Sequence, residues 1–170
     1  MKIKNSENNT NLKIEELTEL IISMHKKISD NENFSTDFML TEKSVDKSFK
    51  QIWARLIKEF NLHIYKEEKI LFPYLINLPK VERKEIPFEE PYFSNVKKPI
   101  EIMKLDHQQL EEYIAQLRDI INKFSFEIQK NEFTQKLQNI FEQIENVIYI
   151  EDEVLFPKAM ELERKLLKNI

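Results

Sequence analysis

The sequence predicts an all-α protein, an antiparallel up-down-up-down four-helix bundle with a long connection between helices 2 and 3. Apolar residues recur every three or four positions in four separate segments, which is the period of helices that bury one face. The chain of 170 residues contains no Gly, so the tight primed turns of β-hairpins are disfavoured. Its six prolines fall at predicted helix ends or in the connection.

The polar residues 1–10 are expected to form a flexible N-terminus, and residues 11–170 are long enough for one bundle domain with a sizeable core. The first predicted helix starts near Asn11, and His25 lies beside its apolar stripe. That stripe consists of Ile14, Leu17, Ile21, Met24 and Ile28. Residues 30–33 interrupt the pattern, and the apolar residues within 34–40 are expected to form a loop that packs on the bundle.

For the second helix, Thr41 or Ser44 is the expected N-cap. Two polar residues, His63 and Glu67, continue a line that is otherwise hydrophobic. The apolar members of that line are Val45, Phe49, Trp53, Leu56, Phe60 and Ile70. Pro73 is expected to stop this helix, because a proline inside a helix lacks the N–H donor.

Residues 74–98 contain four aromatic residues and three prolines, and they are expected to form the long connection. Pro99 fits the first turn of the third helix. His107 stands on the apolar seam of that helix, which runs through Ile100, Met103, Leu110, Ile114, Leu117 and Ile121.

Asn131 and Thr134 indicate a turn and the start of the fourth helix. Its seam contains Glu151 in an otherwise apolar row, formed by Leu137, Ile140, Phe141, Ile144, Val147 and Leu155. Pro157 is expected to kink or end the helix, and an amphipathic tail follows.

An eleven-residue motif occurs twice. Residues 63–73, HIYKEEKILFP, return as residues 147–157, VIYIEDEVLFP, with six of the eleven positions identical. Both copies keep the glutamate, but the His of the first copy is Val147 in the second. The chain therefore looks doubled, because His25 and His107 also occupy similar positions ahead of the two copies.

Buried carboxylates are very costly without a compensating charge, and no Lys or Arg occupies the inner seam. A divalent cation would supply that charge, and imidazole with carboxylate suits iron, manganese or zinc. The candidate ligands are His25, His63, Glu67, His107 and Glu151. The alternative is that the histidines are ordinary core residues and the glutamates lie at the solvated edge. The pair His63 and Glu67 is spaced i to i+4, unlike the Glu-x-x-His pairs of ferritin-type bundles.

Four segments carry a resemblance to a known family: Met24-His25, residues 63–73, residues 99–107, and Glu151 with residues 154–157. In these segments the sequence resembles the hemerythrin-like, HHE cation-binding family over roughly residues 12–160. The likeness is nearest to its di-iron branch that repairs iron–sulfur clusters after nitrosative or oxidative damage. The resemblance implies that Glu67 and Glu151 bridge two irons and that His25, His63 and His107 are terminal ligands.

The sequence departs from this family at Val147, where the family has His. Glu111, solvent, or Asp46 are the alternatives for what compensates. Asp46 would lie about 25 Å from His63 in one straight helix, so Glu111 is the better substitute. We also expect no counterpart of the Cys-bearing N-terminal domain that many repair proteins carry. Tyr65 and Tyr149 are either second-layer donors to the site or exposed helix-face residues.

The resemblance implies a non-haem di-iron protein in nitrosative or oxidative stress or iron–sulfur cluster repair. The alternatives are a non-catalytic O2 or NO sensor, carrier or iron-binding protein with a degenerate site, and a bundle that has lost its metal and acts as an interaction module. No Cys occurs, which excludes thiolate chemistry. With a net charge of −4 and no long apolar run, we expect no nucleic-acid partner, no membrane partner, no secretory signal and a cytoplasmic location. A homodimer is possible.

Overall fold

The computed structural model describes residues 9–41, 43, 45–124 and 131–168, and within these residues the regular structure is entirely helical. Residues 1–8 of the predicted flexible N-terminus lie outside the described residues. The elements are α2 (Ile14–Ser29), α3 (Thr36–Thr41), α4 (Lys47–Lys66), η1 (Glu67–Leu71), α5 (Phe72–Glu82), α6 (Lys97–Ile121), α8 (Glu132–Ile150), η2 (Glu151–Leu155) and α9 (Phe156–Leu167).

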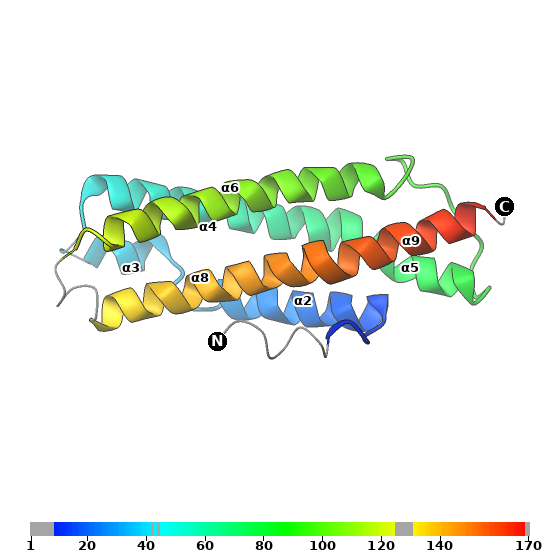
Figure 1. Cartoon of the computed structure of the whole chain (residues 1–170), viewed down its shortest axis with the longest axis horizontal. Coiled ribbons are helices and arrows are strands. Elements are labelled where there is room, and N and C mark those ends of the chain that lie inside the picture. The colour runs from blue at the N-terminus through cyan, green and yellow to red at the C-terminus, as the bar shows by residue number, and fades with distance from the viewer. Residues whose placement is uncertain (1–8, 42, 44, 125–130, 169–170) are drawn as a thin grey trace.

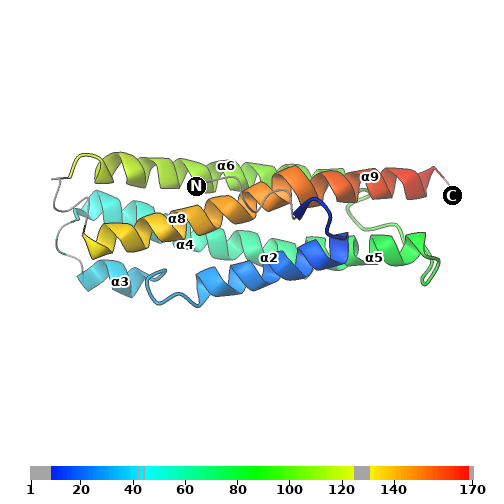
Figure 2. The same cartoon turned by 60° about the horizontal axis from the view of Figure 1, so that its bottom comes forward.

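The described helices form a long antiparallel bundle, which confirms the predicted fold class (Figure 1). α4, η1 and α5 make one continuous rod, and α8, η2 and α9 make a second (Figures 1 and 2). These two rods run opposite to α2 and α6, so successive rods alternate in direction. α4 packs on α6, and α2 packs on both α8 and α5. None of the described helices is long and apolar enough to cross a membrane.

The core at one end of the bundle is aromatic. Trp53, Phe49 and Phe60 are fully or almost fully buried, and the ring of Phe34 contacts Trp53 edge-on at 5.6 Å between centroids. The Trp53 indole N–H donates to the carbonyl of Ser35 at 2.9 Å. This bond fixes the segment between α2 and α4 on the bundle. The expected loop at 34–40 therefore packs as predicted, although it includes the short helix α3.

Side-chain caps set the starts of α4 and α8. Asp46 accepts a hydrogen bond from the Phe49 N–H at 2.8 Å, so the prediction of Thr41 or Ser44 as the cap was wrong. Asn131 accepts from the Thr134 N–H at 2.9 Å, at the helix start that the sequence predicted.

The prediction that Pro73 stops the second helix was also wrong, because the helix continues to Glu82. The reason is the π-helical turn η1, in which the Phe72 N–H bonds the carbonyl of Glu67, five residues back instead of four. The shifted bonding lets Pro73 sit in the first turn of a new α-helix, where a missing N–H costs little. Pro157 follows η2 in the same way.

The connection between the second and third rods is therefore shorter than predicted and spans residues 83–96. α5 ends in a Schellman motif: the Glu85 N–H bonds the Lys80 carbonyl and the Lys84 N–H bonds that of Val81, each at 2.9 Å. Lys84 has a positive φ of 60°, at a position where glycine is usual but the chain has none.

The buried carboxylate of Glu163 on α9 ties this connection to the bundle. It accepts a hydrogen bond from the Tyr74 hydroxyl at 2.7 Å and bonds from the Val96 N–H at 2.9 and 3.1 Å. Val96 is the N-cap of α6, so Glu163 satisfies a helix-start N–H from another helix. Burial, together with this carboxylate, raises the pKa of Tyr74.

Glu163→Ala leaves the buried Val96 N–H and Tyr74 hydroxyl without their partner, and we expect a loss of about 1–3 kcal/mol in unfolding free energy. Glu163→Gln keeps an acceptor and should lose less. Glu161→Ala on the same helix is the control, because Glu161 pairs only with basic residues at the surface. Urea unfolding measures the three variants, and equal midpoints for Glu163→Ala and the parent would contradict this role.

Candidate metal centre

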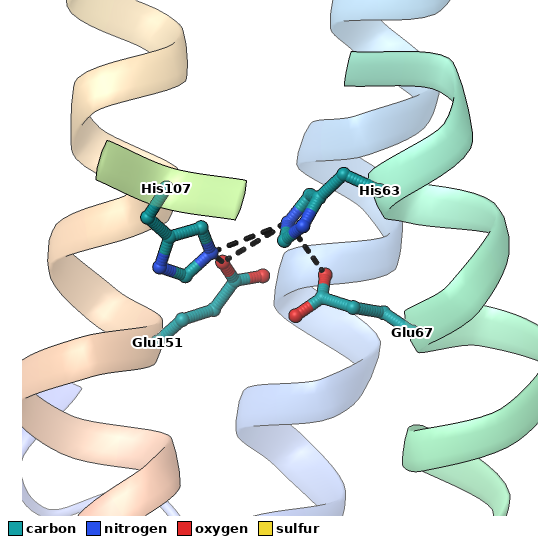
Figure 3. A group of neighbouring side chains, drawn as sticks. All are labelled: His63, Glu67, His107 and Glu151. Atoms are coloured by element: carbon teal, nitrogen blue, oxygen red, sulfur yellow. Dashed lines mark hydrogen bonds and ion pairs between the residues drawn. The ribbon is translucent and has the colours of Figure 1, made fainter. Parts of the chain in front are cut away.

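Three histidines and two glutamates from all the rods meet in the middle of the bundle. His25 comes from α2, His63 from α4 and His107 from α6, while Glu67 and Glu151 are the first residues of η1 and η2. Each is at most 1% exposed. The structure thus brings together all five residues proposed from the sequence, and Figure 3 shows four of them pointing toward one another.

The distances within the cluster are those of groups that face a common point. His107 Nε2 lies 3.1 Å from Oε2 of Glu151, and His63 Nε2 lies 3.3 Å from Oε2 of Glu67. His25 Nε2 lies between the carboxylates, 3.6 Å from Glu67 and 3.4 Å from Glu151. One ligand atom from each of His63, Glu67, His107 and Glu151 lies within 4.8 Å of all the others. This compactness suits a metal ion.

The hydrogen bonding of the cluster also fits a cation. Among the described residues, both carboxylate oxygens of Glu67, both of Glu151 and the Nε2 of His25 are buried without a hydrogen-bond partner. Unsatisfied buried polar atoms cost about 1–3 kcal/mol each, and more when charged. A bound cation accepts lone pairs from all these atoms, so the donor set fits a metal.

The two carboxyl groups have pKa values shifted in opposite directions. Burial, with the negative charge of Glu151, raises the pKa of Glu67 to about 7. Burial also opposes ionisation of Glu151, but the three imidazoles around it hold its pKa well below the usual range. Likewise, burial alone would lower the pKa of His107, yet Asp152 and Glu151 raise it to about 9. These shifts show how strongly the buried carboxylates favour positive charge beside them.

Two outer acids orient His25 and His107 in the same manner. The Nδ1 of His25 lies 3.2 Å from the carboxylate of Glu68, and the Nδ1 of His107 lies 3.1 Å from that of Asp152. Carboxylates on the far nitrogen typically fix the tautomer and raise the basicity of metal-binding histidines. Each outer acid directly follows a buried glutamate, and this doubled acid in both motif copies is the sequence signal that was missed.

A third outer acid, Asp106, faces the remaining imidazole. Its carboxylate lies 3.6 Å from the Nδ1 of His63 and 2.7 Å from the Nζ of Lys66. The Asp directly before His107 therefore faces the histidine of a neighbouring helix, at ion-pair distance. No local sequence pattern pairs Asp106 with His63, so only the packing of α4 on α6 reveals the contact.

The phenylalanine of each Leu-Phe-Pro segment stacks on an imidazole. Phe72 lies parallel to His25, with ring centroids 6.2 Å apart, and Phe156 lies parallel to His107 at 6.0 Å. Both phenylalanines directly follow a π-helical turn. Each repeat copy therefore supplies a buried carboxylate, an outer acid and an aromatic ring.

Neither proposed replacement for the missing histidine reaches the site. Val147 is buried in the core at 1% exposure. Asp46 is the N-cap of α4, and Glu111 is exposed on α6, where it lines a surface groove. Tyr65 and Tyr149 are 60% and 46% exposed, which agrees with helix-face residues and not with second-layer donors.

Buried imidazoles and carboxylates that converge inside a helical bundle are typical of metal-binding bundle proteins. The family model described as Hemerythrin HHE cation binding domain matches residues 13–159. The chain therefore belongs to the hemerythrin HHE cation-binding family, as the motifs indicated. No curated protein and no solved structure matches the chain significantly.

The π-helical turns place the buried glutamates, and the prolines that follow should stabilise these turns. Pro73 and Pro157 are exposed, so they add little packing, and in a regular α-helix each ring would meet the carbonyl four residues earlier. We expect Pro73→Ala and Pro157→Ala to permit a regular helix that misplaces the glutamate or the stacked phenylalanine. Metal affinity should then fall by roughly tenfold.

Pro79→Ala is the control for the loss of a helical proline, because Pro79 lies inside α5 away from either π-helical turn, and unlike Pro73 and Pro157 it is buried. Calorimetric titration with Fe(II) or Mn(II) compares the three variants. An unchanged affinity in both Pro73→Ala and Pro157→Ala would show that side-chain packing alone maintains the turns.

Proposed function

We propose that this protein holds non-haem iron between Glu67 and Glu151, with His25, His63 and His107 as further ligands. The observation that carries the proposal is the pair of fully buried carboxylates without hydrogen-bond donors among the described residues. A cation satisfies both, whereas the bundle supplies no buried Lys or Arg in its described core.

Iron is the metal that we favour, and two ions are the expected complement. Imidazole and carboxylate ligands suit iron, manganese and zinc, so the donor set alone leaves these three. The match to the cation-binding family, together with the motif likeness to its di-iron branch, favours iron. Two carboxylates offer four oxygens, enough to bridge a pair of ions, although only three imidazoles accompany them.

When bound, such iron would supply reversible binding or reduction of a small diatomic molecule, O2 or NO. We propose a role in nitrosative or oxidative stress, including iron donation to damaged iron–sulfur clusters. The support is the sequence likeness of residues 63–73, and of Glu151 with residues 154–157, to the repair branch. The chain has no cysteine, so it would deliver iron without a thiol of its own.

A second candidate is a non-catalytic O2 or NO sensor, carrier or iron-binding protein. The observation that favours this candidate is the burial of the site, because its five residues are at most 1% exposed. A substrate larger than a diatomic molecule would have to displace packed side chains. Reversible spectral changes with O2 or NO and no turnover would favour this candidate.

Glu67→Ala and Glu151→Ala test the metal proposal. Protein produced in iron-rich medium should contain more than one iron per chain, and each variant should lose most of it. Glu111→Ala is the control, because it removes an exposed glutamate from α6 and should leave the iron content unchanged. Elemental analysis with an absorption spectrum gives the stoichiometry. Full iron content in both Glu67→Ala and Glu151→Ala would refute the ligand assignment.

The difference in melting temperature between Glu67→Ala and the parent should change sign when iron is added. With a chelator, Glu67→Ala removes carboxylate repulsion, so its melting temperature should equal or exceed that of the parent. With iron at 100 times its Kd, the parent gains about 2.7 kcal/mol by mass action and should be the more stable protein. A parent protein that binds no iron would instead support the remaining hypothesis, a bundle that has lost its metal and acts as an interaction module.

A further inference from the structure

Large apolar side chains are exposed along the seam between the α4–α5 rod and α6. They are Leu62, Ile70, Ile102 and Leu105, with exposed fractions of 45%, 38%, 51% and 64%. Each lies within about one helical turn of Lys66 or Asp106, which form the ion pair that closes this seam at 2.7 Å. We call these four residues the apolar stripe. Isolated apolar residues are ordinary on a surface, but a group around one seam marks an interaction site.

Residues of opposite charge flank the apolar stripe on its two helices. They are basic on the α4–α5 rod and acidic on α6, namely Lys58 and Lys69, and Glu101 and Glu112. The members of each pair lie four residues before and seven residues after a leucine of the stripe, Leu62 on α4 and Leu105 on α6. Residues at these spacings share a helix face, so the charges border the apolar side chains. All four charged residues are exposed.

The flanking charges lie at matching heights along the bundle. α4 and α6 run antiparallel, and the Nε2 atoms of His63 and His107 are 3.2 Å apart, which fixes how the two helices are aligned. Lys58 and Glu112 are each five residues from this histidine pair, so both lie about 7.5 Å to the same side of it. The other two charged residues are each six residues away on the opposite side, or about 9 Å. Each lysine is therefore level with a glutamate across the seam.

The corresponding face over α2 and α8 lacks this pattern. The two motif copies align α4 with α8, and the matching surroundings of His25 and His107 align α2 with α6. In this alignment the two leucines of the stripe correspond to polar residues, Asn146 and Ser23. The four flanking charges correspond to acids on both helices, namely Glu142, Glu153, Glu19 and Asp30. Because both faces belong to one bundle fold, that fold does not itself require the stripe or its charges.

We propose that two copies of this chain form a homodimer through the apolar stripe, with the two-fold axis parallel to the rods. Such an axis places α4 of one protomer on α6 of its partner at an unchanged height. Lys58 then faces the partner's Glu112, and Lys69 faces the partner's Glu101. A two-fold interface must be complementary to itself, and this surface is so in both its apolar and its charged parts. An axis across the rods would instead bring lysines toward lysines, which is costly.

A second copy of the chain fits the charges of this surface better than a partner of one sign. Lys58 lies 3.8 Å from Glu59 and Glu101 lies 3.6 Å from Lys97, but such exposed contacts within one helix contribute little and are easily exchanged. An acidic partner would be attracted to α4 and repelled by α6, and a basic partner the reverse. The apolar stripe contains none of the candidate metal ligands, so this inference does not depend on the proposed function.

Sedimentation equilibrium of the full chain over a wide range of protein concentration tests the dimer. The parent should show a reversible monomer–dimer equilibrium. Leu105→Glu places a charge within the stripe and should weaken association by about tenfold or more. Ser23→Glu is the matched control, because Ser23 is the exposed counterpart of Leu105 on α2, and it should associate like the parent. Leu105 is itself exposed, so both variants should keep the melting temperature of the parent monomer.

An exchange of charges tests the direction of the two-fold axis. Lys58→Glu and Glu112→Lys each bring like charges together twice in a homodimer, so each should associate about tenfold more weakly than the parent at low ionic strength. An equal mixture of these two variants pairs opposite charges at both contacts and should associate like the parent. Glu142→Lys is the control, because Glu142 is the exposed counterpart of Lys58 on α8, and it should leave association unchanged.

Several outcomes would overturn this inference. A parent that stays monomeric at every concentration does so, and binding of that monomer to phosphatidylcholine vesicles would assign the stripe to a lipid surface instead. Equal association of the parent and Leu105→Glu excludes the stripe as the interface. A mixture of Lys58→Glu and Glu112→Lys that associates no better than either variant alone overturns the packing of α4 on the partner's α6. If Leu105→Glu fails to fold, the mixture still decides, because its substitutions lie at exposed positions.

Discussion

The structure depends on the confinement of two carboxylates, Glu67 and Glu151, in the centre of an otherwise apolar bundle. Burying ionised groups is among the largest penalties that a fold can carry, and it is tolerated only when positive charge lies close by. Here three imidazoles surround the pair, and each imidazole has a carboxylate on its outer nitrogen. The alternation of acid, imidazole and acid from the centre outward favours a bound cation. The apolar helices around it exclude the water that would otherwise relieve the charge.

The backbone is adapted to the same constraint. Both glutamates open a π-helical turn, an irregularity that is uncommon in helices and frequent at functional sites. Each turn changes the helical phase, so a glutamate and a phenylalanine on the same rod can both face the cluster. The following proline, Pro73 or Pro157, is compatible with that shift and unfavourable in a regular helix. The repeat therefore encodes a local backbone shape together with its side chains.

Periodicity was sufficient to predict the rods and the inward positions of His63, Glu67, His107 and Glu151, because each of these four continues an apolar row, and His25 lies directly beside one. The helix ends were harder to predict. Pro73 was interpreted as a stop because single-sequence rules assume i to i−4 bonding, and a π-helical turn evades that assumption. Asp106 and Glu163 act on residues far away in the sequence, so their roles emerge only from packing. Glu111 shares the helix of His107, but it is exposed on α6, which the spacing alone did not resolve.

The most direct test of the central claim is anomalous diffraction at the iron absorption edge from crystals grown with Fe(II). The account predicts an anomalous peak between the carboxylates of Glu67 and Glu151, within coordination distance of both and of at least two of the three imidazoles. An iron-loaded crystal whose anomalous peaks all lie elsewhere, with hydrogen-bonded water between these two carboxylates, would contradict it.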